Sequence, residues 1–567
     1  MCSDSRGDVV EETGLPGGAG ERRKAPGRRL FLGFAAAVLA PWPAGLTTAA
    51  DAEAAGAAAD ADSADATDPA ADRVRRGHGL DVEAENALPG SPDWRITRAG
   101  PAGAVEGFAD RVSVCPGEPF TLRVSTTSAS YTVSAYRMGW YGGARARLVW
   151  KSAALPGVRQ PPARIDPGTR IAHAPWEPTA RVDTSGWPEG CYLLRLDTQD
   201  GRAQRYLPLT VRSSSTAGRT VVINAVATWQ AYNRWGGADL YKGSTGKNGS
   251  RSLQVSFDRP YANRQGAGQF LVFEAPLIAL AERLGLPLAY TTGLDVARDP
   301  DLLRGAAALV SPGHDEYWSP EQRRHVTRAR DAGTNLAVLG ANCCYRRIRF
   351  AASSTAPDRI VVCYKNDYAQ DPGFQQGLPP TNDFRREPAP EPESSLLGVI
   401  YDGYPVNAPY VVSHPDHWLL AGTGARAGDS FPHLVGVEFD RVNLSHPTPR
   451  PIEVLAHSPV LCKGRRSYAD TAYLTLPGGA AVFATGTMRW VEALEAGAPG
   501  TGKAPHGLDA RAGHFTRTVT ANVLRAFARR AAGRSQPAQD NLAALYGDTS
   551  ASSCEHAPPT TGHVERR

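Results

Sequence analysis

The sequence lacks three features that would place it quickly in a protein class. No apolar run reaches the roughly 18 residues of a stable membrane span. Eight cysteines among 567 residues are too few for a disulfide scaffold. The net charge is only +5, and no long block of Lys and Arg with interleaved aromatic residues occurs, so no dedicated nucleic-acid binding is expected. The length allows two or three domains with sizeable hydrophobic cores.

The first 78 residues have the composition of a targeting segment followed by a linker. Arg28 and Arg29 precede an apolar stretch at 30–40, and small residues follow at 47–50. This pattern predicts a signal peptide over residues 1–50, and the arginine pair favours the twin-arginine export route over an ordinary secretory signal or an uncleaved anchor. We therefore expect an exported protein, secreted or in the cell envelope, with no stable membrane span after signal removal. Residues 51–78 are rich in Ala and Asp and predict a disordered linker.

Residues 79–212 show short alternating strands separated by Pro and Gly, with almost no helical periodicity. Strands are predicted at 111–114, 120–124, 131–136, 192–196 and 206–211, a pattern typical of an immunoglobulin-like β-sandwich. Cys115 and Cys191 can form a disulfide in an exported protein, but two buried free thiols are an equally good interpretation. The aromatic, glycine-rich turn at 138–143 can bind a ligand or pack against the next domain, and we favour packing.

Residues 219–530 alternate between strand and helix, which predicts an α/β domain with a mainly parallel sheet. Buried strands are predicted at 220–224, 288–292, 306–311 and 335–339. Helices are predicted at 270–284 and 320–331, and a turn and helix at 295–303. Later strands are predicted at 359–364, 435–439, 452–456, 471–475 and 481–485, before a closing helix at 515–529. The polar tail at 531–567 is predicted to be disordered.

The unit at residues 306–345 organises this domain. Ser319 is a good helix N-cap and Pro320 a good first helical residue, so the start of the helix between the two strands is well marked. A His, two carboxyl groups and a Tyr follow the first strand at 314–317, and an Asn and a Tyr follow the second at 342 and 345. Ligands of open parallel sheets bind beyond the carboxyl ends of the strands. The sequence therefore predicts a binding site there.

Five motifs, taken in order, resemble the large-subunit family of N,N-dimethylformamidase. They are Trp-Gln-Ala-Tyr-Asn at 229–233, Gly-His-Asp-Glu-Tyr-Trp at 313–318, Gly-Ala-Asn at 340–342 with the tyrosine at 345, Val-Val-Cys-Tyr-Lys at 361–365, and Gly-Thr-Met at 486–488. The resemblance covers residues 220–528 and implies a glutamine-amidotransferase-like α/β domain behind an all-β domain. It also implies a mononuclear ferric iron held by two tyrosines and one glutamate. Matched motif to motif, these ligands would be Tyr317, Tyr345 and Glu438, the last by its position on a late strand.

The resemblance implies an exported, metal-dependent hydrolase of C–N bonds in small-molecule amides. Two phenolates and a carboxylate suit ferric iron with open positions, and such an ion polarises an amide carbonyl and lowers the pKa of a bound water. His314 or Glu316 would carry the proton of that water. The predicted substrate-binding residues are Trp229, Tyr232, Asn233 and Asn342. The sequence Cys-Cys-Tyr-Arg at 343–346, the lack of a small-subunit partner and the export signal depart from characterised members, so formamide is not assigned as the substrate.

Three other interpretations use the same residues. Tyr317 and Trp318 can simply fill a crevice, while Asp315 and Glu316 interact with the dipole of the following helix. Alternatively, the chain is a non-enzymatic exported protein whose sandwich and aromatic loop at 229–235 hold a glycan or surface polymer. A homo-oligomer is compatible with either function.

The third alternative is a cysteine nucleophile. Cys343 follows a strand and a Gly-Ala-Asn turn, and His314 is expected on a nearby loop. The Gly-x-Cys-x-Gly spacing is absent, however, and Cys343 or Cys344 can instead pair with Cys363 or Cys462. The histidines at 414, 417 and 433 are assigned no role.

Overall fold

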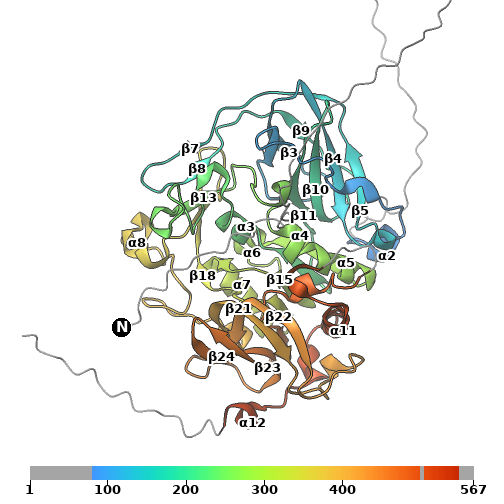
Figure 1. Cartoon of the computed structure of the whole chain (residues 1–567), viewed down its shortest axis with the longest axis vertical. Helices are drawn as coiled ribbons and strands as arrows, with labels where there is room; N and C mark the ends of the chain where they lie inside the picture. Colours follow the sequence, from blue (N-terminus) through green and yellow to red (C-terminus); the bar gives the residue numbers. More distant parts are fainter. Residues whose placement is uncertain (1–78, 499–503, 548–567) are drawn as a thin grey trace, which may run out of the picture. The chain divides into compact units, whose positions relative to one another are not determined.

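The computed structural model describes residues 79–498 and 504–547 (Figure 1). The predicted signal peptide, its twin-arginine pattern and the linker lie outside these residues. The described residues belong to one compact unit, made mostly of β-strands in several sheets with few helices. Among them, no helix is both long and apolar enough to cross a membrane.

Two sheets near the start of the described chain share one hydrophobic core. Phe120 and Val124 of the smaller sheet pack with Val133 and Leu194 of the larger one, and all four are buried because strand residues alternate between two faces. The orders are β1-β3-β9 and β2-β11-β10-β4-β5, with β6 paired to β4 and a separate β7-β8 pair. The predicted strands are present, although the first has only two residues. The bounds are β1 Val105–Ala109, β2 Ser113–Val114, β3 Phe120–Thr126, β4 Ser130–Met138, β5 Ala146–Lys151, β6 Leu155–Pro156, β7 Arg164–Ile165, β8 Ala172–His173, β9 Ala180–Val182, β10 Gly190–Thr198 and β11 Gln204–Val211.

A seven-stranded sheet follows, with the order β14-β12-β15-β17-β25-β24-β23. The first five strands run parallel to their neighbours, and the last two pair antiparallel. The parallel pairing agrees with the predicted alternation of strand and helix. The strands are β12 Thr220–Asn224, β14 Leu288–Thr292, β15 Ala308–Gly313, β17 Asn335–Gly340, β23 Ile452–Cys462, β24 Arg465–Thr475 and β25 Ala481–Ala484.

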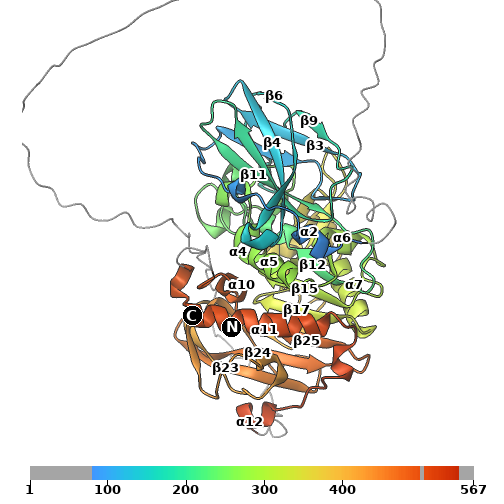
Figure 2. The ribbon, with the colours of Figure 1, turned by 90° about the vertical axis from the view of Figure 1, so that its right-hand side faces the viewer.

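Helices cover both faces of this sheet. Val222 lies in one core with α5 and α11, whereas its neighbours Val221 and Ile223 lie in another with α6 and α7. Figure 2 shows α11 lying along the sheet. The helices are α2 Val82–Asn86, α3 Val226–Ala231, α4 Phe270–Phe273, α5 Ala275–Arg283, α6 Gly293–Arg298, α7 Pro320–Asp331, α8 Pro372–Gln375, α9 Ser394–Leu397, α10 Trp490–Ala493, α11 Ala510–Phe527 and α12 Leu542–Tyr546.

The central strand–helix–strand unit forms as predicted. The side chain of Ser319 accepts a hydrogen bond from the backbone N–H of Gln322, and Pro320 is the first residue of α7. Beyond the sheet, short strands extend this edge, and β16 pairs in parallel with β18, which places Tyr317 opposite Arg346. The remaining strands are β13 Gln254–Ser256, β16 Tyr317–Trp318, β18 Arg346–Arg347, β19 Arg349–Ala351, β20 Ile360–Val362, β21 Ile400–Val411 and β22 Ser430–Arg441.

The aromatic turn after β4 packs against α5, as the packing interpretation predicted. The guanidinium of Arg283 lies 4.8 Å from the Trp140 ring centroid. Beside it, Arg137 of β4 forms a fully buried ion pair with Glu282 of α5, with an Nη2–Oε1 distance of 2.6 Å. A buried charge is tolerated only when it is paired, so this contact fixes the sandwich on the helix.

Two predictions about the fold were wrong. The helix predicted at 270–284 is broken at Glu274, whose carboxylate accepts hydrogen bonds from the indole of Trp229 and the backbone of Ala225. The tail is ordered as far as residue 547, because Asn541 exchanges hydrogen bonds with the backbone of Val454 and Leu542 is fully buried. Residues 548–567 lie outside the described part of the chain. All six described cysteines are free thiols, so neither proposed bridge forms among them.

Removing the buried part of Leu542 should weaken the fold. We expect Leu542→Ala to cost about 2–5 kcal/mol, the range for an aliphatic side chain that leaves a cavity, and to lower the melting temperature. The matched control is Leu444→Ala, because Leu444 is 41% exposed and should change stability little. Equal melting temperatures for the two variants would show that α12 does not belong to the folded core.

Candidate functional site

The predicted site forms at the carboxyl ends of β15 and β17. His314, Glu316, Tyr317 and Asn342 are each at most 3% exposed. Gly340 permits the close approach of the two strands, since a Cβ there would stand 2.0 Å from the carbonyl oxygen of Gly313. The strand ends therefore bring the polar groups of both loops into one buried region.

Glu316 lies at the centre of this region and is surrounded by phenol oxygens. Its carboxylate oxygens lie 2.7 and 2.8 Å from the hydroxyl of Tyr241, and one of them lies 2.6 Å from the hydroxyl of Tyr232. The two hydroxyls are 2.9 Å apart. Three side chains from distant parts of the chain thus place their oxygens within hydrogen-bond distance of one another. We call this set the Glu316 cluster.

Basic groups border the Glu316 cluster. The Nε of Arg346 is 3.3 Å from Glu316, and the Nζ of Lys365 is 3.3 Å from the centroid of the Tyr241 ring. Burial alone would raise the pKa of Glu316, but His314 and the charges of Arg346 and Lys365 lower it. Burial lowers the pKa of Lys365 to about 7, helped by the charge of Arg346. Glu316 is therefore a fixed anion in the centre of the site.

Tyr232 and Tyr241 remain phenols while they share protons with Glu316. Burial raises the pKa of both hydroxyls well above the usual value, and the negative charge of Glu316 raises it further. Only a strong competing charge, such as a multivalent cation, would remove those protons.

His314 lies beside the cluster with its two ring nitrogens in different surroundings. Nδ1 is 3.1 Å from the side-chain oxygen of Gln269. Nε2 has no hydrogen-bond partner within the described chain, and lies 3.6 Å from Glu316 and 4.0 Å from Glu438. The ring is also packed edge-on against Phe273. Nε2 is thus the nitrogen of His314 that faces the two glutamates.

Glu438 and Asn342 also line the candidate site, next to His314. The amide Nδ2 of Asn342 donates to Glu438 at 2.8 Å, and its backbone N–H donates to Asp440 at 2.8 Å. Burial raises the pKa of Glu438 well above its usual value, and the negative charge of Glu316 adds to this effect. The surroundings of Glu316 thus favour its ionised carboxylate, whereas those of Glu438 favour the protonated acid.

The three metal ligands predicted from the motifs share no hydrogen bond with one another among the described residues. The Tyr345 hydroxyl donates to Asp383 at 2.9 Å, and the Tyr317 hydroxyl has no hydrogen-bond partner among the described residues. No hydrogen bond in this part of the chain joins the two phenol oxygens. In the pairing of β16 with β18, Tyr317 lies opposite Arg346, and Tyr345 immediately precedes β18. Glu438 contacts Asn342 instead.

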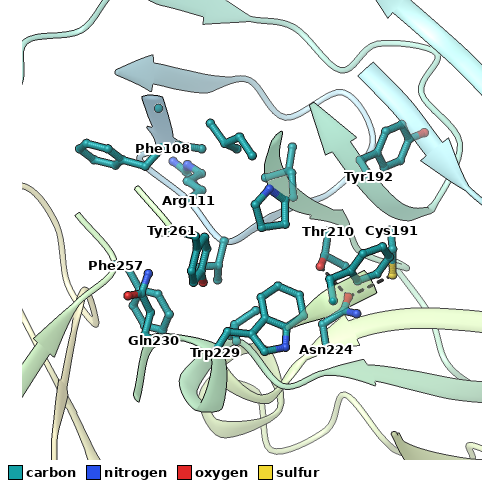
Figure 3. Close-up of a pocket in the computed structure, with 18 of the residues that line it drawn as sticks. Phe108, Arg111, Cys191, Tyr192, Thr210, Asn224, Trp229, Gln230, Phe257 and Tyr261 are labelled. Atoms are coloured by element: carbon teal, nitrogen blue, oxygen red, sulfur yellow. Dashed lines mark hydrogen bonds between the residues drawn. The ribbon is translucent and has the colours of Figure 1, made fainter. Parts of the chain in front are cut away.

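The predicted substrate-binding residues divide into two groups. Tyr232 and Asn342 belong to the site, whereas Trp229 and Asn233 are buried behind it. Trp229 binds Glu274, and the amide of Asn233 donates to the Pro260 carbonyl oxygen at 2.8 Å. Trp229 lines a different pocket, between the sandwich and the α/β sheet (Figure 3).

Sequence reasoning missed four residues of the candidate site, namely Tyr241, Gln269, Arg346 and Lys365. Tyr241 lies nine residues after Tyr232 in a segment without a recognisable motif, and Gln269 lies in the last position before α4. Lys365 ends the Val-Val-Cys-Tyr-Lys motif, but nothing in that motif indicates a role for it in the site. The only signal that could have found Tyr241 is the requirement of a buried Glu316 for hydrogen-bond donors.

The cysteine alternative receives no support from the geometry. The Cys343 thiol lies 3.4 Å from the hydroxyl of Ser311, and neither it nor Cys344 hydrogen-bonds to His314 in the described structure. Burial raises the pKa of Cys343 well above its usual value, with a smaller contribution from Asp315. A thiol held in its protonated form is a poor nucleophile.

One protein-family model matches residues 132–504, and its description is N,N-dimethylformamidase beta subunit-like, C-terminal. This chain belongs to that family. Family membership supports a dimethylformamidase-like hydrolase. The match begins in β4, so it includes much of the β-sandwich as well as the α/β sheet, a wider extent than the motifs indicated. A search of curated proteins found no match. Among the described residues, no group of three or more His, Cys, Asp and Glu side chains is arranged to hold a metal ion.

Thiol labelling tests the burial of the cysteines. In the native protein at pH 8, we expect iodoacetamide to modify Cys115 well before Cys343, because Cys115 is partly exposed and Cys343 is 3% exposed with a raised pKa. Mass spectrometry of tryptic peptides measures both rates. Rapid labelling of Cys343 with loss of activity would revive the nucleophile interpretation. Denatured protein, in which both sites react, is the control.

Proposed function

We propose that this chain is an iron-dependent hydrolase of small amides in which Tyr232, Tyr241 and Glu316 hold the metal. The observation that supports this choice is the convergence of two phenol oxygens and a carboxylate at mutual distances of 2.6–2.9 Å. The composition, two tyrosines and one glutamate, is the ligand set that the family resemblance implied. The motif-based set, Tyr317, Tyr345 and Glu438, is the competing assignment.

The Glu316 cluster fits a small, highly charged cation. Oxygen ligands at about 2.0–2.1 Å from an ion in octahedral geometry are separated by roughly 2.9 Å along each edge, close to the spacing of the cluster. Carboxylate and phenolate oxygens are hard ligands that favour ferric iron over softer metals. Most protein metal sites use His, Cys, Asp and Glu side chains, whereas this set has two tyrosines and a single acidic residue.

Iron, when bound, would supply a Lewis acid for the amide carbonyl and for water. The side chains supply the proton handling. Glu316 already accepts hydrogen bonds from two tyrosines and faces Arg346, so it has little capacity to carry a proton. His314 presents a free Nε2 between the two glutamates and would receive the proton of the attacking water, then pass it to the leaving amine. The hydrogen bond from the amide of Asn342 holds Glu438 beside His314.

We also propose the specific fold of each part of the chain and the export of the protein. The shared core of the two N-terminal sheets supports an immunoglobulin-like sandwich, and the five parallel strands covered on both faces support a glutamine-amidotransferase-like domain. The arginine pair and apolar stretch of the N-terminal segment support export.

A glycan- or polymer-binding function is less well supported. The aromatic loop would have to expose its rings for stacking, but Trp229 is 3% exposed, and Trp235 packs edge-on against Trp176 of the β8–β9 segment. These rings stabilise the contact between sandwich and sheet.

Iron binding tests the proposal and separates the two ligand sets. We expect the purified protein to bind iron and to show a tyrosinate-to-iron absorption band. Tyr232→Phe, Tyr241→Phe and Glu316→Gln should each abolish the band and cut amide turnover at least about 100-fold, because each removes a ligand. Elemental analysis, absorption spectra and a screen of small amides measure these effects.

The matched controls are Tyr317→Phe, Tyr345→Phe and Glu438→Gln. We expect these variants to keep the iron and its band, since their oxygens lie outside the Glu316 cluster. Loss of iron in the control set with retention in the first set would reverse the assignment. A wild-type protein that stays colourless after iron addition would remove the metal from the function altogether.

A further inference from the structure

Within residues 79–498 and 504–547, Gln269 is the one side chain that hydrogen-bonds to Nδ1 of His314. Its Oε1 lies 3.1 Å from Nδ1, and the side chain is 6% exposed. An amide oxygen only accepts hydrogen bonds, so this contact requires a proton on Nδ1. In a neutral imidazole the other nitrogen is then an acceptor. The hydrogen bond made by one ring nitrogen sets the state of the other.

We propose that Gln269 is a positioning residue that keeps Nδ1 of His314 protonated and aims Nε2 at the reacting atoms. The inference rests on the proposed function, in which His314 carries a proton. Phe273, one turn further along, packs edge-on against the ring with a centroid distance of 5.6 Å and restricts its rotation. The α4 segment therefore holds His314 from two sides.

The position of α4 is itself fixed by a buried carboxylate. Glu274 is fully buried, and it accepts hydrogen bonds from Trp229 and from the side chain of Asn224, the last residue of β12. Asn224 in turn accepts from Thr210 of β11, at 2.8 Å (Figure 3). A continuous set of contacts thus runs from the sandwich through α4 to His314. This arrangement explains why the predicted helix is interrupted at Glu274.

The test uses a double-variant cycle on the full chain. Gln269→Leu should lower kcat about tenfold or more while KM and iron content change little, as expected when a group that orients a functional histidine is lost. Gln269→Glu keeps an acceptor at this position and should restore much of the rate. Because Gln269 acts through His314, its substitution should have no further effect in a His314→Ala background. Gln322→Leu, which alters another buried glutamine on α7, is the matched control.

A second measurement does not depend on turnover. Nitrogen-15 NMR of histidine-labelled protein, with the His314 signals identified by their loss in His314→Ala, should show a protonated Nδ1 in the wild type. In Gln269→Leu the proton should move in part to Nε2. An unprotonated Nδ1 in the wild type, or unchanged signals and rates in Gln269→Leu, would overturn the inference. Absence of amide turnover with the expected change in signals would refute the proposed function and leave the role of Gln269 intact.

Discussion

The buried negative charge of Glu316 is the constraint on which the arrangement of the site depends. An ionised carboxylate in a protein interior is tolerated only when donors and cations surround it. Here the donors are Tyr232 and Tyr241, and the nearest cation is Arg346. Arg346 also pairs with Asp383, which accepts the hydroxyl of Tyr345. One carboxylate thereby decides which tyrosines face the centre of the site and which are held outside it.

The sequence was sufficient to predict elements whose signals are local. Ser319 and Pro320 predict the start of α7, and the apolar runs predict β12 and β14 with the bounds that the structure shows. It also predicted that polar side chains gather beyond the ends of β15 and β17, because that follows from the parallel sheet. The family resemblance predicted two tyrosines and a glutamate. Matched motif to motif, it predicted Tyr317, Tyr345 and Glu438. The set that we propose instead includes Tyr241, which reaches Glu316 across 75 residues, so only the folded chain brings the two together.

Trp229 shows how a correct motif can mislead about a role. Its aromatic loop has the composition of a ligand-binding surface, but the indole N–H finds the buried carboxylate of Glu274 and the ring packs between Tyr261 and Phe270. Glu274 requires such donors, because burial raises its pKa to about 8 and each hydrogen bond lowers the cost of the charge. Tyr232, three residues later, lies beyond the end of α3 and reaches Glu316. The motif therefore combines one residue that supports the fold with one that belongs to the site.

The same electrostatic constraint would favour tyrosine as a ligand of the proposed metal ion. A trivalent ion that displaces the two phenol protons raises the local charge by one unit, whereas binding to neutral ligands such as histidine would raise it by three. In an interior of low dielectric, the smaller change costs far less. Arg346 already supplies positive charge beside Glu316, so additional uncompensated charge would be strongly unfavourable there. Bound to such an ion, Tyr232 and Tyr241 would be phenolates whose protons have passed to solvent, and Glu316 would keep its negative charge.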